Sequence, residues 1–328
     1  MNRTRFVIGI VSTLAGAIAW DLSGTCVQYL FERTEIDTLL LTSLRQLGAG
    51  AVFLVVLLAR DRTQLSTMLR DGPTLRSLAI FGIFGLFANS ALYAATISYT
   101  NAGTATVLQS LNVPMVLALA CLRARRLPRA GELAALACAV AATFLIATGG
   151  DPRSLSLPLI GLVLGVATAA ASVFYTSYPK PLFARWGSLA TTGLGMVVAG
   201  ATGMVVWLLT GGITKGFPAL DGTAWLVLGV ASLVGTFGAY GLFLHGVSIL
   251  GPVLGNMLGA AEPVSATVIT ALWLGTAFSW ADWAGLALMV ATIIIVTQLP
   301  KDGASSDDPN SPPEATVPPT GSPERRDD

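Results

Sequence analysis

Charged residues are scarce in this chain of 328 residues. Lysine, arginine, aspartate and glutamate make up 11% of it, whereas a soluble domain usually carries about 25%. Hydrophobic residues make up 53%, and the mean hydropathy is +0.70. The net charge of +1 provides no basic surface for nucleic acid. This shortage of charge over almost the whole length excludes an ordinary soluble domain and predicts an all-α polytopic membrane protein.

Residues that bind metals or perform catalysis are equally rare. The sequence has one histidine, His245, and three cysteines, Cys26, Cys121 and Cys138, without CxxC or Cys/His spacing. It has no HExxH motif and no P-loop. It therefore offers no metal site, no cofactor site and no recognisable enzyme or ATPase motif, and we interpret the cysteines as packing residues. His245 is predicted at a helix end, as a pH switch or simply as a polar terminus.

Ten apolar segments are each long enough to cross a bilayer, which takes about 20 residues. They are residues 6–30, 36–59, 74–98, 102–122, 131–149, 157–178, 188–210, 223–246, 250–275 and 280–299. Two pairs of segments are nearly continuous, and we divide them at the turn-forming residues of Tyr99–Gly103 and Gly246–Pro252. These short hairpins are predicted at opposite mouths of the bundle, either as gates or as plain connections.

Lysine and arginine are distributed unevenly between the two sides of these segments. Fifteen lie on the side of the N-terminus and three on the opposite side, while Arg45 lies inside the second segment. Positively charged loops stay in the cytoplasm, so the N- and C-termini are predicted to be cytoplasmic in a multi-pass protein of the cell membrane. Residues 300–328 are rich in proline, serine and aspartate, which predicts a disordered cytoplasmic tail.

The two halves of the chain repeat one another weakly. Pro114 in the fourth segment and Pro263 in the ninth are 149 positions apart, and each interrupts an apolar helix. A shift of 150 places the fifth segment on the tenth, and a shift of 152 places the first on the sixth. Five spans is an odd number, so the halves must insert with opposite orientations. The expected architecture is ten transmembrane helices in two inverted five-helix repeats, residues 1–150 and 151–299, around a central site.

Three short motifs now carry a family resemblance. They are AEP at residues 261–263, LNVP at residues 111–114 and WDLSGT at residues 20–25. In ten helices of this arrangement they resemble the drug/metabolite transporter superfamily, specifically its EamA-type transporters, over roughly residues 6–299. The resemblance implies secondary transport of small metabolites, often the proton-coupled export of amino acids or drugs.

Three charged residues are predicted near the middle of the membrane. At about 1.5 Å per helical residue, Asp21, Arg45 and Glu262 lie ~22, ~16 and ~18 Å from the cytoplasmic side. Burial favours the protonated form of a carboxylic acid and a nearby guanidinium favours the ionised form, so Asp21 first and Glu262 second are candidate proton carriers with Arg45 beside them. The alternatives are a permanent ion pair for Arg45, a bond from Glu262 to backbone freed by Pro263, and polar packing for Asp21.

Aromatic and amide residues gather in the helices predicted to line a central cavity. They are Trp20, Asn89, Tyr93, Gln109, Asn112, Tyr175, Tyr178, Tyr240 and Asn256. Aromatic walls with a few amide donors suit a small amphiphilic or cationic substrate. Each residue taken singly could equally bond neighbouring helices together or anchor the membrane interface.

The sequence therefore predicts a secondary active transporter that exports a small metabolite, with protons as the coupling ion, by alternating access. Uptake of a small cation such as choline by the same fold is the first alternative. A membrane-embedded enzyme and a membrane scaffold are the others, and the missing motifs disfavour the enzyme. The fifth and tenth segments carry small residues such as Ala134 and Ala141 and are predicted to lie peripherally, facing lipid or a second copy of the chain in a homodimer.

Overall fold

The computed structural model describes residues 3–151, 155–212, 214, 216–250, 258–259 and 261–298, and all its regular elements there are helical. The first half contains α1 (Arg3–Arg33), α2 (Thr38–Arg60), α3 (Arg62–Arg70), α4 (Gly72–Ile80), η1 (Phe81–Phe87), α5 (Ala88–Tyr99), α6 (Ala102–Gln109), α7 (Asn112–Arg123) and α8 (Ala130–Thr148). The second contains α9 (Leu159–Ser177), α10 (Lys180–Trp186), α11 (Ser188–Trp207), η2 (Leu208–Gly212), α13 (Gly222–Ser232), η3 (Leu233–Gly238), α14 (Ala239–Leu250), α16 (Glu262–Leu274) and α17 (Trp280–Gln298). The elements η1 and η3 are wider π-helical turns.

Among the described residues, nine helical runs are long and apolar enough to cross a membrane. They are Thr4–Arg33, Thr38–Arg60, Gly72–Tyr99, Ala102–Arg123, Ala130–Thr148, Leu159–Trp186, Ser188–Gly212, Gly222–Val247 and Trp280–Gln298. Each corresponds to one predicted segment. Of the remaining segment, 250–275, the structure describes the apolar helix α16, while residues 251–257 and 260 lie outside the described part, as does the tail from residue 299.

Helix boundaries follow from capping chemistry. The side chains of Asp37, Asn101 and Asp221 each accept a backbone N–H bond, of 2.8, 2.8 and 2.7 Å respectively, at the start of α2, α6 and α13. At the other end, α8 and α16 stop at Gly149 and Gly275, whose φ values of 64° and 66° are readily adopted by glycine. Polar caps thus end the apolar runs where the membrane interface is expected.

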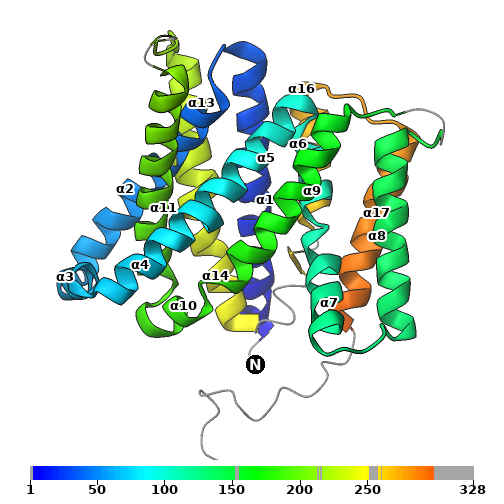
Figure 1. Ribbon diagram of the computed structural model, residues 1–328, viewed down its shortest axis with the longest axis horizontal. Coiled ribbons are helices and arrows are strands. Elements are labelled where there is room, and N and C mark those ends of the chain that lie inside the picture. Colours follow the sequence, from blue (N-terminus) through cyan, green and yellow to red (C-terminus); the bar gives the residue numbers. More distant parts are fainter. Residues whose placement is uncertain are drawn as a thin grey trace, which may run out of the picture.

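The helix α1 runs through the middle of the bundle, where it packs against α14, α16 and α13 of the second half and against α5 and α6 of the first (Figure 1). The pairs α2–α11 and α8–α17 lie on opposite sides of it (Figure 1). The start of α1 and the end of α17 lie at the same end of the bundle (Figure 1). Side chains such as Leu209, Leu272 and Val140, which are 81%, 82% and 70% exposed, give it an apolar exterior suited to lipid.

Small residues let α2 and α11 approach closely. A Cβ atom added to Gly50 would lie 2.9 Å from the Val197 Cγ2 atom, and one added to Gly200 would lie 2.6 Å from the Leu47 Cγ atom. No larger residue fits at either place unless the neighbour moves. This is the packing that helices without a strong mutual hydrophobic drive use in membranes.

Two helices are interrupted close to the middle of the bundle. Between α6 and α7 the chain turns at Ser110 and Leu111, and Pro114 follows in the first turn of α7. In the second half, α16 begins at Glu262, directly after a turn at Ala261, and Pro263 lies in its first turn. Proline is tolerated at both places because the first turn of a helix has no internal partner for its N–H groups.

Candidate functional site

The stretch WDLSGT at residues 20–25 lies in the buried middle of α1. Residues two apart on a helix point in nearly opposite directions, so this stretch reaches several neighbours at once. Asp21 contacts α16, whereas Ser23 contacts α13 and α2. Gly24 lies against Tyr93 of α5. The middle of α1 is therefore one of the places where both halves of the chain meet.

Asp21 is only 4% exposed and accepts a hydrogen bond from the hydroxyl group of Ser265 on α16. The same hydroxyl lies 3.0 Å from the carbonyl oxygen of Ala261 and 3.1 Å from that of Glu262. Asp21 and Glu262 interact electrostatically, so the two predicted carriers are neighbours. Within the described part of the chain, the Glu262 carboxylate has no hydrogen bond, including to the backbone beside Pro263.

Arg45 lies on the other side of α1 from this acidic pair. Its Nη1 atom donates to the Ser23 hydroxyl at 3.0 Å, and that hydroxyl donates in turn to the carbonyl oxygen of Ala231 at 3.2 Å. Neither Asp21 nor Glu262 is within ion-pair distance of the guanidinium; the ion pairs found in the described residues involve other groups. The structure thus brings together two of the three predicted charged residues and places Arg45 with hydroxyl and carbonyl oxygens.

Tyr93 is close to both Arg45 and the two acids. Its hydroxyl group is 2.8 Å from the Thr106 hydroxyl, and it interacts electrostatically with Arg45, Asp21 and Glu262. A Cβ atom added to Gly24 would lie 2.5 Å from the Tyr93 oxygen. The glycine in the WDLSGT stretch is therefore what lets the phenol reach the backbone of α1.

The predicted amide residues form a bonded chain across three helices. Gln109 of α6 donates to the Ser172 hydroxyl at 3.0 Å, and Ser172 of α9 donates to the Asn89 side chain of α5 at 2.7 Å. In the described conformation these amides bond neighbouring helices together. Asn112 is the first residue of α7, beside the helix break, and Asn256 lies outside the described residues.

The predicted aromatic residues pack mainly against other aromatic rings. Trp20 meets Tyr240 edge-on, with ring centroids 5.1 Å apart. Tyr175 stacks on Phe81 at 6.0 Å, and Tyr178 stacks on Phe174 of its own helix at 4.8 Å. Trp20 and Tyr240 join α1 to α14, so they form a wall of the central region, whereas the Tyr178 stack is local.

Gln28 of α1 closes the end of the bundle opposite the N-terminus. Its side-chain oxygen accepts the N–H of Ala102 at 2.8 Å, and its nitrogen donates to the Thr276 hydroxyl at 3.2 Å. Next to it, Tyr29 stacks on Trp273 at 5.9 Å. We call this group the Gln28 latch. This group was not predicted from the sequence, although an amide inside an apolar helix is itself a signal for a buried polar contact.

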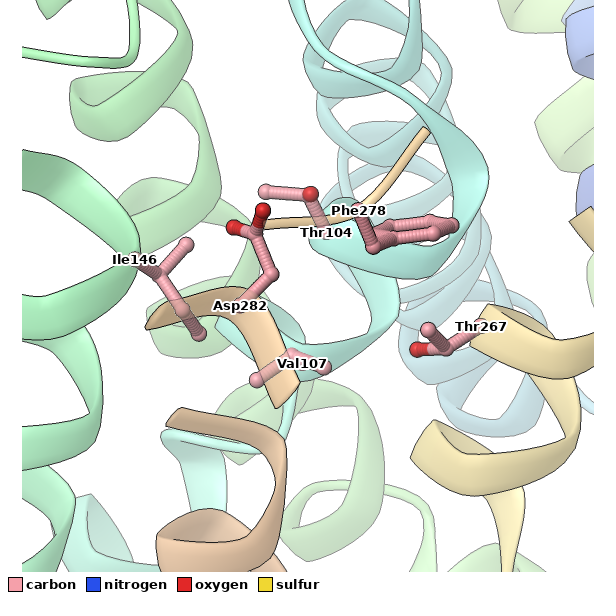
Figure 2. A pocket seen from close by; sticks show the side chains of 6 residues that line it. All are labelled: Thr104, Val107, Ile146, Thr267, Phe278 and Asp282. Atoms are coloured by element: carbon pink, nitrogen blue, oxygen red, sulfur yellow. The ribbon is translucent and has the colours of Figure 1, made fainter. Parts of the chain in front are cut away.

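A small cavity beside this latch shows how closely the chain is packed here (Figure 2). It is lined by Thr104, Val107, Ile146, Thr267, Phe278 and Asp282. Its volume of about 10 Å³ is that of a single water position. No route for a metabolite passes through a space of this size, so this cavity is not a substrate passage in the described conformation.

A second polar group ties the halves together at the N-terminal end of the bundle. Arg185 of α10 forms an ion pair with Asp71 at 3.0 Å, and the Trp186 indole donates to the Thr74 hydroxyl at 3.0 Å. Gln64 of α3 donates to the Trp186 carbonyl oxygen at 2.6 Å. We call this group the Trp186 latch. It joins α3 and α4 to α10, whereas the gates predicted from sequence were the hairpins at Tyr99–Gly103 and Gly246–Pro252, of which the second lies partly outside the described residues.

Comparison with known proteins adds to this geometry. The model of the EamA-like transporter family matches residues 7–148 and 159–298. The chain belongs to the EamA-like transporter family. The resemblance predicted from the short motifs is thereby confirmed, and this EamA transporter is a multi-pass protein of the cell membrane.

Among its relatives is the "uncharacterized inner membrane transporter YicL" of Salmonella typhimurium, which is 32% identical over 296 residues covering 88% of this chain and 95% of the relative. The "uncharacterized inner membrane transporter YedA" of Escherichia coli is 25% identical over 79% of this chain and 81% of its own length. A solved structure entitled "Crystal structure of protein" has a TM-score of 0.56 at 20% identity, over 90% of this chain and 97% of that one. This likeness supports the fold of the EamA transporter and says nothing about its function.

Proposed function

We propose that this EamA transporter is a secondary active exporter of a small metabolite, coupled to protons, that alternates access between two inverted five-helix halves. The observation that carries the proposal is Asp21, an acid 4% exposed in the middle of a membrane-spanning helix and bonded across the two halves to Ser265. An acid at that depth is costly and is a functional candidate by default.

Helix spacing supports the division into two halves. The helix pairs α2 and α11, α4 and α13, α7 and α16, and α8 and α17 each begin 150 residues apart. The π-helical turns η1 and η3 also correspond, and both contain the pattern Gly-x-Phe-Gly, at residues 82–85 and 235–238. A duplicated unit explains such regular spacing better than chance does.

Packing partners exchange between the halves, as inversion requires. The helix α1 packs on α14 of the second half, and its counterpart α9 packs on α5 of the first. An added Cβ at Gly9 in α1 would lie 2.7 Å from Leu250 at the end of α14. One at Gly161 in α9 would lie 2.8 Å from Thr100, directly after α5. Contacts that swap in this way are expected for two halves related by an axis in the membrane plane.

The proton-coupling step follows from the acidic pair. Two acids that repel one another in a low-dielectric interior cannot both remain ionised without a cation beside them, and Arg45 is bonded elsewhere. The pair is therefore expected to hold a proton in the described conformation. Opening either latch would hydrate the pair on one side and allow the proton to leave.

The test first identifies the transported compound and then measures whether a pH gradient drives its transport. Untargeted metabolite profiling of medium and cytoplasm, in cells with and without the gene, identifies the compound and its direction. Wild type and Asp21→Asn are then reconstituted in proteoliposomes with an imposed pH gradient. Gradient-driven counter-transport is expected in wild type and lost in the variant. Asp221→Asn is the matched control, since it makes the same change at an exposed helix cap where asparagine also serves.

Each result has a definite meaning. Wild-type flux that ignores the pH gradient would show that coupling to protons is wrong. Normal gradient-driven flux in Asp21→Asn would remove Asp21 from the mechanism. Depletion of the compound from the medium of cells that carry the gene would show uptake in place of export.

A further inference from the structure

In the part of the chain that the structure describes, Arg45 is a membrane-embedded cation that pairs with no acid. It lies within the spanning helix Thr38–Arg60, and among the described residues its guanidinium bonds to one hydroxyl group and forms no ion pair. The sequence offers only Asp21 and Glu262 as acids at comparable depth, and both interact on the α16 side of α1. An arginine at this depth is costly unless an anion or water joins it.

The geometry around Arg45 leaves donor capacity unused. A guanidinium has five N–H donors in a planar fork, and the Ser23 hydroxyl accepts from one of them, at 3.0 Å. Ser23 is itself held by the Ala231 carbonyl oxygen, which fixes the direction of the arginine. The side chain is partly buried, and its Nε and Nη2 atoms are not among the fully buried polar atoms that lack a partner in the described residues. Tyr93 and Cys26 are close enough to interact electrostatically, and neither supplies a permanent negative charge.

We propose that Arg45 binds a carboxylate group of the transported metabolite, and that the cargo therefore carries a single carboxylate. The inference rests on the proposed transport function and names the chemistry of its substrate. The planar fork of arginine matches the two oxygens of a carboxylate, and the pairing removes the unneutralised charge. One arginine with no second cation at this depth suits a monoanion better than a phosphate dianion. The binding site lies between α1, α2 and α5, where Ser23, Arg45 and Tyr93 meet.

Binding is measured without a pH gradient, so that it does not depend on proton coupling. Purified full-length protein in lipid nanodiscs is titrated with matched probes: leucine and phenylalanine, their C-terminal amides, and the amines that remain when the carboxylate is removed. Short monocarboxylic acids of the same carbon skeletons complete the set. Shifts in the thermal unfolding midpoint, with competition among the probes, give relative affinities. The expected result is that probes with a carboxylate bind about 10- to 100-fold more tightly than their amides, the factor that a charged hydrogen bond provides.

The variants separate charge, geometry and folding. Arg45→Gln is expected to lose the preference for carboxylates, and Arg45→Lys to retain part of it because it keeps the charge without the fork. Ser23→Ala removes the hydroxyl group that directs the guanidinium, so it should weaken the preference without abolishing it. Arg76→Gln, at an exposed position on α4, is the matched control. If Arg45→Gln does not fold, wild type and Arg45→Lys still decide the question through the comparison of acid with amide.

Three results would overturn the inference. They are amides or amines that bind wild type as well as the acids do, an Arg45→Gln protein that keeps the preference for acids, and the failure of every carboxylate probe to bind wild type. The test of proton coupling, in wild type and in Asp21→Asn, bears on the proposed function. Its outcome does not change the result of this binding test.

Discussion

The contact between Gly24 and Tyr93 makes a quantitative prediction about how tightly the central region is built. Replacing Gly24 with alanine would place a Cβ atom 2.5 Å from the Tyr93 oxygen, with the nearest ring carbons at 3.5 and 3.6 Å. Only the hydroxyl oxygen is too close, because distances of 3.5 Å are ordinary van der Waals contacts. Removing that single oxygen should therefore remove the whole conflict.

The magnitude follows from three effects. Overpacking costs about 1–3 kcal/mol, and a phenol that retreats loses its 2.8 Å contact with Thr106, which is a further ~1 kcal/mol. Against these, alanine in a helix interior is favoured over glycine by about 0.5–1 kcal/mol. Gly24→Ala alone should thus destabilise the protein by about 1–3 kcal/mol. In a Tyr93→Phe background the same change should be neutral or stabilising by up to about 1 kcal/mol.

A double-mutant cycle tests this reasoning. The four proteins are wild type, Gly24→Ala, Tyr93→Phe and the double variant, compared by reversible unfolding in detergent. The expected coupling free energy is about 1–4 kcal/mol, above the ~0.5 kcal/mol of independent sites. Gly229→Ala is the control, since a Cβ atom there meets nothing within 4 Å and should be tolerated in both backgrounds. Additive effects of the two central substitutions would refute the close approach of Tyr93 to α1.

Two further predictions concern packing and closure. Gly200→Leu should lower the unfolding free energy by about 1–3 kcal/mol, because the first added atom would already lie 2.6 Å from the Leu47 Cγ atom. An unchanged thermal midpoint would contradict the close packing of α2 on α11. Gln28→Leu should open the Gln28 latch by leaving the N–H of Ala102 without its partner, so a cysteine placed at Thr276 should react faster with a water-soluble maleimide than in the Gln28 background. Equal rates would mean that the latch does not hold this end closed.

The spans were predictable because their physical cause is local. Length and hydropathy decide whether a segment can cross a bilayer, and both can be counted along the sequence. The helix ends could be predicted nearly as well, since Asp37, Asn101 and Asp221 are ordinary helix caps. The short helix α3 was missed because it is polar, with an arginine at each end (Arg62 and Arg70), and so lacks the apolar pattern of a span. Its residues still form a capped helix.

The partners of the charged residues were not predictable in the same way. Counting residues gives the depth of Asp21 and Arg45 but not the direction in which each helix faces. That direction depends on how α1 packs against α13 and α16, which is set by contacts far apart in sequence. Because of the way α1 is rotated, Ser23 accepts a hydrogen bond from Arg45, and Asp21 accepts one from Ser265. The depths alone had favoured a pairing of Arg45 with an acid.

The spacing of the helices repeats between the two halves, but the charged residues do not. This difference suggests how transport could gain a direction. At the spacing of the helices, Arg45 corresponds to Gly195 and Glu262 to Asn112, and at the shift of α1 onto α9 Asp21 corresponds to Val173. Each charged residue thus lacks a charged counterpart in the other half. If the halves are inverted as proposed, they can exchange conformations at similar cost, since their packing is alike. Because α1 carries Asp21 and, through Ser23, holds Arg45, movement of this one helix relative to α16 and α2 would change the proposed proton site and the proposed anion site together.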